Sequence, residues 1–291
     1  MYYYIINPAS GGGKINKIQD KLKERLKELG IAGEFAKSTG PGDIARLTKM
    51  AIERNYKTIV AVGGDGTINE IINAVGDSSV ALGIIPTGSS NELANMLGIP
   101  DWTTACNILA ARKVEEVDLG LINDKLFVTS ASIGFDNVIY DMKRGRGAAN
   151  SLSKFAFITK LSAIAKVFKP IHLELNFDGR YSVETECFNF SLSNGAFLNY
   201  LPQKSKPQDN MLDAVLISHL NFRDALKYGQ GTLDLSKKLG QVSVFHTKKI
   251  KITSKEPVTV SADGKAVAET PVTIEVSDRK LRVIVSKKRH F

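Results

Sequence analysis

The hydrophobic pattern of this chain changes its period near residue 120, and that change limits the folds it can adopt. Before this point, short β-like runs alternate with apolar segments of helical spacing, such as 2–6 followed by 14–29. After it, apolar and polar residues alternate, as in 171–177, where Asp178-Gly179 then predicts a hairpin turn. The first pattern is typical of a mainly parallel sheet covered by helices, and the second is typical of an antiparallel sheet.

We therefore predict two domains with a boundary at residue 122. Residues 1–122 are expected to form an α/β domain, and residues 123–291 a β-rich antiparallel domain whose last strand can return to the first. The length of 291 residues supports this division, because it exceeds what one hydrophobic core usually serves. The other predicted elements are strands at 58–62, 80–85, 188–192, 249–253, 258–260, 272–276 and 281–285, and helices at 68–75, at 91–97 and from Asp101 onward.

The composition is typical of a globular protein, with 43% hydrophobic and 24% charged residues. No apolar run reaches the roughly 20 residues needed to cross a bilayer, and the first residues lack the basic region of a signal peptide. Cys106 and Cys187 are the only cysteines, too few for a disulfide framework or a zinc site. We therefore expect a cytoplasmic protein.

The formal net charge of +9 favours anionic partners such as nucleotide phosphates, anionic lipid surfaces or nucleic acid. The basic residues are dispersed, with small clusters at 143–146, 248–251 and 287–289. An ordinary solvated surface is the alternative interpretation of each cluster. Because the sequence has no zinc-finger spacing and no RRM signature, we do not expect nucleic acid as a partner.

Three glycine-rich segments lie where predicted strands end and helices begin, at 7–14, 63–67 and 86–92. In an open α/β sheet, ligands bind at such junctions. Glycine lets backbone N–H groups approach phosphate oxygens, and the N-terminus of the following helix adds a favourable dipole. The P-loop and dinucleotide-binding patterns both fail at these segments. We therefore expect a nucleotide that is held in another way.

Helix capping is the alternative interpretation of two of these segments. Residues 67–70 and 89–92 both match the S/T-x-x-E capping box, so they could simply start helices, with the glycines in tight turns. Capping does not explain Asp65, which stands between two glycines and has no apolar role. An acid in such a loop favours a functional site.

The segment Gly63-Gly64-Asp65-Gly66-Thr67, followed by Asn69-Glu70, resembles the signature of the diacylglycerol kinase catalytic domain family, which includes bacterial soluble lipid kinases and sphingosine kinases. GGDGT alone also occurs in NAD kinases, but the full set of motifs is specific and covers nearly the whole chain. The other motifs are Asn7-Pro8-x-Ser10-Gly11, Pro86-x-Gly88-Ser89-x-Asn91, Asp118-Leu119-Gly120, Ser132-Ile133-Gly134-Phe135-Asp136, Asp209-x-x-Leu212-Asp213 and Asp263-Gly264.

The resemblance implies an N-terminal nucleotide domain and a β-sandwich-like C-terminal domain. It also implies a structural Mg²⁺ held by the Asp209 side chain and by the carbonyls of Lys206 and Met211, which suits a cation that prefers oxygen ligands. From the residues alone, Asp209 and Asp213 are equally compatible with ordinary turn carboxylates. By position, the resemblance places ATP at Asn7, Pro8, Ala9, Ser10, Gly11, Ser38, Gly63, Gly64, Asp65, Gly66, Thr67 and Ser89.

Three positions depart from the family pattern. Ser89 replaces a Thr and keeps the hydroxyl, whereas Glu92 replaces an Asp and is one methylene longer. The family's Asp-Gly-Glu, whose Glu resembles a general base for the lipid hydroxyl, ends in Lys265 here. An ammonium accepts no proton near neutral pH unless its pKa is strongly depressed. The predicted catalytic residues are therefore Asp65, Lys265 and Asp263, the nearest substitute base, with Glu269 more distant.

These features predict an ATP-dependent lipid kinase that transfers the γ-phosphate to a hydroxyl of diacylglycerol or a related lipid, slowly because of Lys265. Two alternatives stay open: an NAD kinase-like enzyme, and a weakly active or non-catalytic lipid- or nucleotide-binding module.

A lipid substrate also predicts peripheral attachment to an anionic membrane surface, through basic and apolar patches such as 154–169. That segment is equally compatible with a packing helix. The oligomeric state is left open, with a homodimer as one option.

Overall fold

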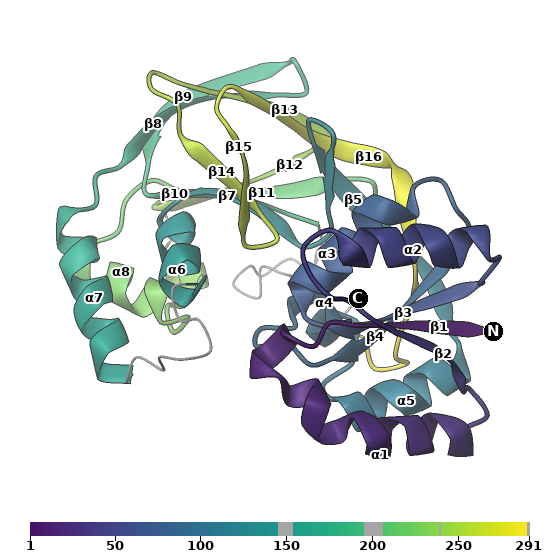
Figure 1. Cartoon of the computed structure of the whole chain (residues 1–291). Helices are drawn as coiled ribbons and strands as arrows, with labels where there is room; N and C mark the ends of the chain where they lie inside the picture. Colours follow the sequence, from purple (N-terminus) through teal and green to yellow (C-terminus); the bar gives the residue numbers. More distant parts are fainter. Residues whose placement is uncertain (145–153, 195–205, 239, 290–291) are drawn as a thin grey trace. The chain divides into compact units, whose positions relative to one another are not determined.

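The computed structural model describes residues 1–144, 154–194, 206–238 and 240–289, and it divides the chain into two compact units (Figure 1). Unit 1 comprises residues 1–119, 126–128 and 277–291. Unit 2 comprises residues 120–125 and 129–276. Strands β5 (Val114–Ile122) and β16 (Val272–Ile284) each begin in one unit and end in the other.

Unit 1 is built on a parallel sheet with the strand order β2-β1-β3-β4. The end of β16 joins this sheet in parallel, with Val283 opposite Leu82. Strands β1, β3 and β4 are buried along their whole length, as expected for strands covered on both faces. The strand bounds are β1 Tyr2–Ile6, β2 Gly33–Lys37, β3 Thr58–Gly63, β4 Ala81–Pro86 and β6 Lys125–Phe127.

Helices cover both faces of this sheet, with α1 and α5 on one face and α2 and α3 on the other (Figure 1). Helix α1 packs through Ile15, Leu22 and Leu26, which are fully buried and spaced along one helical face. The predicted start at Asp101 is confirmed, because its carboxylate accepts the amides of residues 103 and 104. The helices are α1 Lys14–Glu28, α2 Asp43–Glu53, α3 Asp65–Val75, α4 Glu92–Met96 and α5 Trp102–Ala111.

Unit 2 contains antiparallel strands in two groups. One is a sheet with the order β12-β11-β10-β7-β14-β15, and the other pairs β9 with β8, β8 with β13, and β13 with the start of β16. The predicted hairpin at Asp178-Gly179 is confirmed, since both residues adopt positive φ angles between β8 and β9. The strands are β7 Ser130–Gly134, β8 Ile171–Phe177, β9 Tyr181–Cys187, β10 Asn189–Ser193, β11 Leu212–Ile217, β12 Val242–Thr247, β13 Lys249–Ser254, β14 Thr259–Ala262 and β15 Lys265–Glu269.

In the described part of unit 2, helices α6 (Phe135–Arg144), α7 (Lys154–Val167) and α8 (Phe222–Gly229) pack on a second core. Phe135, Phe168 and Phe188 form its aromatic centre, with ring centroids 4.5–5.2 Å apart. The predicted fold class, a mainly parallel α/β domain followed by an antiparallel β-sandwich-like domain, is confirmed.

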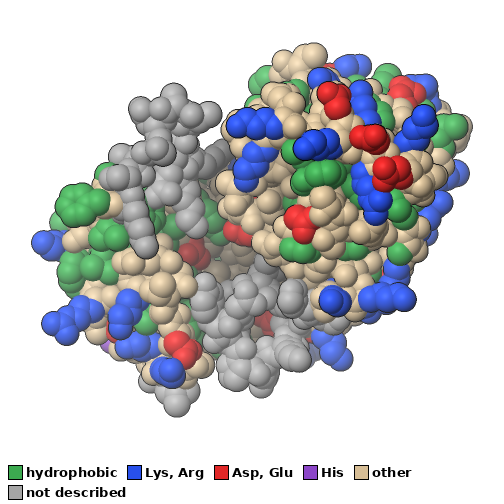
Figure 2. All heavy atoms as spheres, turned by 90° about the horizontal axis from the view of Figure 1, so that it is seen from below, with side chains coloured by type: hydrophobic (Ala, Val, Ile, Leu, Met, Phe, Trp, Pro, Cys, Tyr) green, Lys and Arg blue, Asp and Glu red, His purple; other side chains and the backbone are tan. Residues whose placement is uncertain are grey.

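The distribution of basic side chains on the surface agrees with their dispersion along the sequence. Lys and Arg side chains are spread widely over the face drawn in Figure 2.

Both cysteines are buried, and burial raises the pKa of Cys106 to about 11 and that of Cys187 to about 12. Neither thiol therefore ionises near neutral pH. Across the described ranges, no helix combines the length and the apolar character that a membrane span requires.

Candidate functional site

Three glycine loops of unit 1 meet at the carboxyl ends of β1, β3 and β4. A Cβ added to Gly64 would lie 2.9 Å from Gly88 Cα, and one added to Gly88 would lie 2.6 Å from Gly64 Cα. Gly11, with φ +57°, leaves no room for a Cβ against the carbonyl oxygen of Thr87. The glycines are therefore required by backbone packing between loops that lie far apart in the sequence.

Asn7 joins the first loop to the second. Its Nδ2 donates to Thr67 Oγ1 at 2.9 Å, its Oδ1 accepts the amide of Ala9 at 3.1 Å, and its own amide donates to the Val62 carbonyl at 3.0 Å. Thr67 is buried, and a side chain on Gly63 would collide with its hydroxyl. This arrangement gives Asn7 and Thr67 a shared positioning role in the loop assembly.

Asp65 is the first residue of α3, directly after the N-cap Gly64. Its Oδ1 accepts the amide of Leu93, in the first turn of α4, at 3.3 Å. The carboxylate thus links the second loop to the helix that follows the third. An acid at a helix N-terminus is also electrostatically favourable. The structure therefore gives Asp65 a packing contact in addition to any chemical role.

The capping-box interpretation is wrong at both segments. Helix α3 begins at Asp65, so Thr67 lies inside the helix and not at its cap. Helix α4 begins after Asn91, whose side chain bonds both backbone polar groups of Gly88 at 2.9 and 3.0 Å. Ser89 is exposed on the third loop. The capping-box pattern compares only residues that are three positions apart. It therefore matched both segments, although longer-range contacts position the start of each helix.

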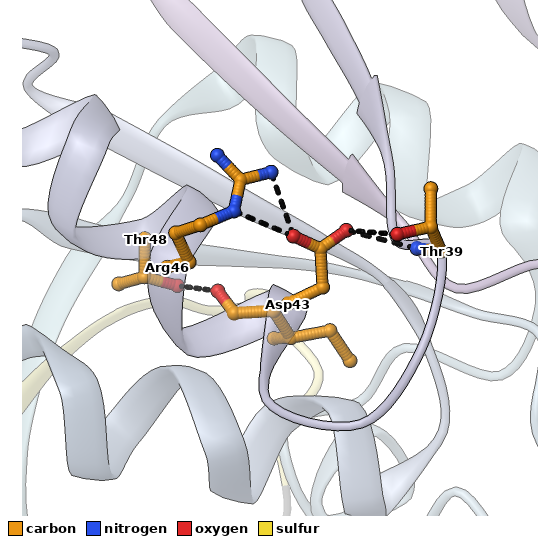
Figure 3. Close-up of polar contacts among 5 residues, drawn as sticks. Thr39, Asp43, Arg46 and Thr48 are labelled. Carbon is orange, nitrogen blue, oxygen red and sulfur yellow. Dashed lines mark hydrogen bonds and ion pairs between the residues drawn. The ribbon is translucent and has the colours of Figure 1, made fainter.

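Ser38 lies beside the first loop, because its amide donates to the Ile6 carbonyl at the end of β1 at 2.9 Å. The turn after Ser38 is held by Asp43, which accepts from the amide and hydroxyl of Thr39 at 2.8 and 3.1 Å and pairs with Arg46 at 2.6 Å (Figure 3). The Thr39 amide and then the Arg46 guanidinium lower the pKa of Asp43, so the acid stays ionised near neutral pH.

Two features of the loops suit an anion. The start of α3, a helix N-terminus, lies directly behind the second loop, and a Cβ built on Gly12 of the first loop would meet nothing within 4 Å. The buried hydroxyl of Thr87, on the third loop, has no hydrogen-bond partner within the described parts of the chain. Sequence reasoning missed Thr87, since a threonine at the variable position of its motif carries no signal.

The predicted metal residues lie in unit 2, on the turn before β11. Asp209 Oδ1 accepts the amide of Met211 at 3.0 Å, an Asx turn that also agrees with the turn-carboxylate alternative. In the described segments no three His, Cys, Asp or Glu side chains gather as a metal cluster. Nearby in sequence, Asp213 is buried: its Oδ1 lies 2.6 Å from His246 Nδ1, and its Oδ2 is unbonded among the described residues. One carboxylate and two carbonyls remain a suitable donor set for a hydrated Mg²⁺.

Asp263 and Lys265 occupy the hairpin between β14 and β15. Asp263 and Gly264 adopt φ angles of 46° and 71°, and Lys265 pairs with Ala262 across the turn. Asp263 Oδ1 accepts the amide and hydroxyl of Thr129 at 2.9 and 2.5 Å, which holds the hairpin against the start of β7. Asp263 thus has a structural partner that the sequence did not indicate.

Two other motifs have structural explanations. Asp136, at the start of α6, accepts from Asn189 Nδ2 and from the Tyr228 hydroxyl, both at 2.9 Å, and so joins three elements of unit 2. Asp118 is buried in unit 1 and pairs with Lys280. Lys280 was missed, because nothing in the local sequence connects two residues so far apart.

Comparison with known proteins defines the class. A model of the "Diacylglycerol kinase catalytic domain" matches residues 1–122, and one of the "YegS C-terminal NAD kinase beta sandwich-like domain" matches residues 129–285. The Bacillus subtilis (strain 168) diacylglycerol kinase is 26% identical, over 98% of this chain and 96% of its own length. The diacylglycerol kinase of Staphylococcus haemolyticus is 24% identical, over 97% of this chain and 87% of its own length.

A solved structure gives the same picture of the fold. A diacylglycerol kinase structure from Bacillus anthracis str. Sterne has a TM-score of 0.75 and 21% identity, over 99% of this chain and 97% of that one. Together the matches place the protein among kinases. Residues 1–122 belong to the diacylglycerol kinase catalytic domain family and residues 129–285 to the YegS C-terminal domain family, and the resemblance inferred from the motifs is confirmed.

Proposed function

We propose that this protein is an ATP-dependent lipid kinase that transfers the γ-phosphate to a hydroxyl of diacylglycerol or a related lipid. The observation that carries the proposal is the convergence of three glycine loops, where Gly64 and Gly88 approach so closely that neither tolerates a Cβ. Such a surface holds phosphates through backbone amides and a helix N-terminus. The family membership and the names of the relatives support the lipid acceptor.

Phosphoryl transfer depends mainly on positioning and on neutralising charge. In this proposal the amides of the loops at Asn7–Gly11 and Gly63–Thr67 bind the triphosphate, with Ser38 and Ser89 at their edges. Asp65 links the start of α3 to the first turn of α4 by accepting the Leu93 amide, and it contributes its charge at the phosphate loop. A divalent cation, when bound by the Asp209 side chain and the carbonyls of Lys206 and Met211, would hold together the turn at 206–211 before β11.

Lys265 sets the expected rate. The ammonium neutralises charge near the transferring phosphate, but it does not take the proton of the lipid hydroxyl. General-base catalysis contributes on the order of 10²–10⁴-fold, so its loss slows the transfer without preventing it. Asp263 is the nearest alternative base, with Glu269 further along β15.

A second candidate is an NAD kinase-like enzyme, favoured by the description of the domain matched at residues 129–285. Incubation with γ-labelled ATP and a panel of diacylglycerol, monoacylglycerol, sphingosine and NAD separates the two. The proposal expects label in a lipid, and label only in NAD would replace it with the second candidate. In the same assay the Asp65→Asn variant is expected to lose label transfer, and the Asp20→Asn variant, at an exposed acid on α1, is its matched control.

A further inference from the structure

A group of serines projects from one face of the six-stranded sheet of unit 2. Residues directly opposite each other in antiparallel strands share a face, and so do residues two positions apart on one strand. The register pairs Ser130 on β7 with Ser193 on β10. It also pairs Ser132, two residues further along β7, with Ser191 on β10 and Ser261 on β14. We call these residues the serine face.

The serine face is polar although it is buried. The exposed fraction is 5% or less for each of Ser132, Ser191, Ser193 and Ser261. The opposite face of β10 is apolar, with Phe190 and Leu192 in the core. Burying a hydroxyl without a hydrogen-bond partner costs free energy, so a sheet face that only packs is normally apolar. Hydroxyls gathered on one buried face therefore favour a polar ligand.

A buried carboxylate extends the serine face. Asp213 on β11 lies opposite Ser193 on one side and opposite His246 on the other, and it is 3% exposed. Its Oδ1 lies 2.6 Å from His246 Nδ1, whereas its Oδ2 is buried and makes no hydrogen bond among the described residues. Leaving a buried acceptor without a donor is costly. The position of Oδ2 therefore suits a hydrogen-bond donor supplied by a ligand on this face.

The serine face adjoins the candidate base site. The Asp263 amide donates to the Ser130 carbonyl at 2.9 Å, so the β14–β15 hairpin continues the row that contains Ser130. Helix α6 borders the face on the β14 side, because Asn137 accepts from the Ser132 hydroxyl at 3.2 Å and donates to the Thr259 carbonyl at 2.7 Å. A ligand on the serine face would therefore lie next to the hairpin that carries the alternative base.

The polar groups of this face select a neutral polyol. A serine hydroxyl both donates and accepts hydrogen bonds, whereas the Asp213 carboxylate only accepts them. A headgroup with several hydroxyls satisfies both, because each of its hydroxyls can donate and accept as well. An anionic headgroup would instead face the charge of Asp213, and like charges repel.

We propose that the serine face and Asp213 bind the headgroup of a lipid acceptor with at least two free hydroxyls, as in monoacylglycerol. Asp213 Oδ2 accepts from the hydroxyl that is not phosphorylated, and the serines hold the same headgroup. The inference rests on the proposed function, because it names the acceptor of that phosphoryl transfer. It favours monoacylglycerol over diacylglycerol, which has one free hydroxyl.

The test compares two water-soluble probes that differ by one hydroxyl. 1-Hexanoylglycerol has two free hydroxyls, whereas the hexanoyl ester of 1,3-propanediol keeps the terminal hydroxyl and lacks the middle one. Calorimetric titration of the full chain measures both affinities, and initial rates with γ-labelled ATP measure label transfer to each probe.

The variants are Ser193→Ala and Asp213→Asn. The matched control is Ser243→Ala, an exposed serine on β12 that pairs with Leu216 and so projects from the other face of the sheet. Circular dichroism verifies that each variant is folded. Ser193→Ala removes one oxygen atom and keeps the test interpretable if Asp213→Asn does not fold.

The unaltered protein is expected to bind 1-hexanoylglycerol at least about tenfold more tightly than the propanediol ester, because the ester leaves polar groups of the site unpaired. Ser193→Ala should lower this ratio of affinities about threefold, as expected for a neutral hydrogen bond. Asp213→Asn should lower it about tenfold, because the lost hydrogen bond involves a charge. Ser243→Ala should leave the ratio within about twofold.

Equal affinities of the unaltered protein for the two probes, or a ratio that neither variant changes, would overturn the inference. A weaker affinity of Asp213→Asn for Mg²⁺ with an unchanged ratio would assign Oδ2 to a cation and would also overturn it. Label transfer to both probes without dependence on the second hydroxyl would overturn the inference while leaving the proposed function intact. A hydroxyl-dependent affinity that both variants lower, without label transfer to any lipid, would support the serine face and contradict the kinase proposal.

Discussion

Substituting Gly88 by alanine is expected to separate two of the three glycine loops. The added Cβ would lie 2.6 Å from Gly64 Cα and 2.7 Å from Asn91 Oδ1, whereas ordinary contact begins at 3.4 Å. The loops must therefore part by about 0.8 Å. Gly88 does not occupy the left-handed region, so the substitution adds steric overlap without backbone strain. Overpacking of this kind costs about 1–3 kcal/mol of unfolding free energy.

The functional effect is expected to exceed the structural one. A displacement near 1 Å in a positioning element can lower rates on the order of 10²-fold. Urea unfolding followed by circular dichroism gives the stability of Gly88→Ala, and calorimetric titration gives its affinity for ATP. Gly40→Ala is the matched control, because its Cβ meets nothing within 4 Å and its φ also lies outside the left-handed region. The control should keep its affinity and stay as stable or gain slightly.

We expect Gly88→Ala to bind ATP at least about tenfold more weakly than the unaltered protein. Unchanged ATP affinity together with the expected loss of stability would show that the loops only pack against one another. In that case the glycines would serve folding, and the phosphate site would have to lie elsewhere in unit 1.

Three further predictions concern Asp65, the hairpin residues Asp263 and Lys265, and Asp101. Asp65→Asn should keep the fold, because the Asn side chain can still accept from the Leu93 amide. The variant should lose phosphoryl transfer, and a turnover equal to that of Asp20→Asn would contradict a role for the charge of Asp65. Lys265→Glu should raise the rate of phosphoryl transfer by about tenfold or more, and Asp263→Asn should lower this rate. Initial rates of label transfer measure both effects, and equal rates in the two variants and the unaltered protein would exclude this hairpin as the base site. Asp101→Ala should lower the unfolding free energy by about 1 kcal/mol at neutral pH, because hydrogen bonds from Thr103 and Thr104 depress the pKa of Asp101 to about 2. This contribution is present above the unfolded pKa near 3.8 and is lost as pH falls toward 2, so a stability difference that persists at pH 2 in urea titrations would contradict it.

The elements with strong local periodicity were predictable from the sequence. The prediction of the helix that contains Ile15, Leu22 and Leu26 was correct, because the spacing of apolar residues defines one helical face directly. The prediction of the turn at Asp178-Gly179 was correct, because few residue types adopt positive φ angles. Strand β2 (Gly33–Lys37) and helix α2 (Asp43–Glu53) were not among the predicted elements. Strand β2 lies at the end of the sheet order and is only half-buried, so its sequence carries a weak apolar pattern.

The contacts that assemble the candidate site were not predictable from local pattern. The hydrogen bond between Asn7 and Thr67 spans 60 residues, and the one between Asp263 and Thr129 spans 134. The order of strands determines such pairs, and no local propensity encodes it. The glycine motifs indicated that the loops belong together, but the close approach of Gly64 and Gly88 emerged only from the folded sheet.

The most direct test of the proposed function is transfer of label from γ-labelled ATP to diacylglycerol by the unaltered protein, measured as labelled lipid product over time. The proposal predicts slow but measurable formation of phosphorylated lipid, faster with Lys265→Glu and absent with Asp65→Asn. If neither the unaltered protein nor Lys265→Glu labelled any lipid or NAD while both still bound ATP, the protein would be a nucleotide-binding module and not a lipid kinase.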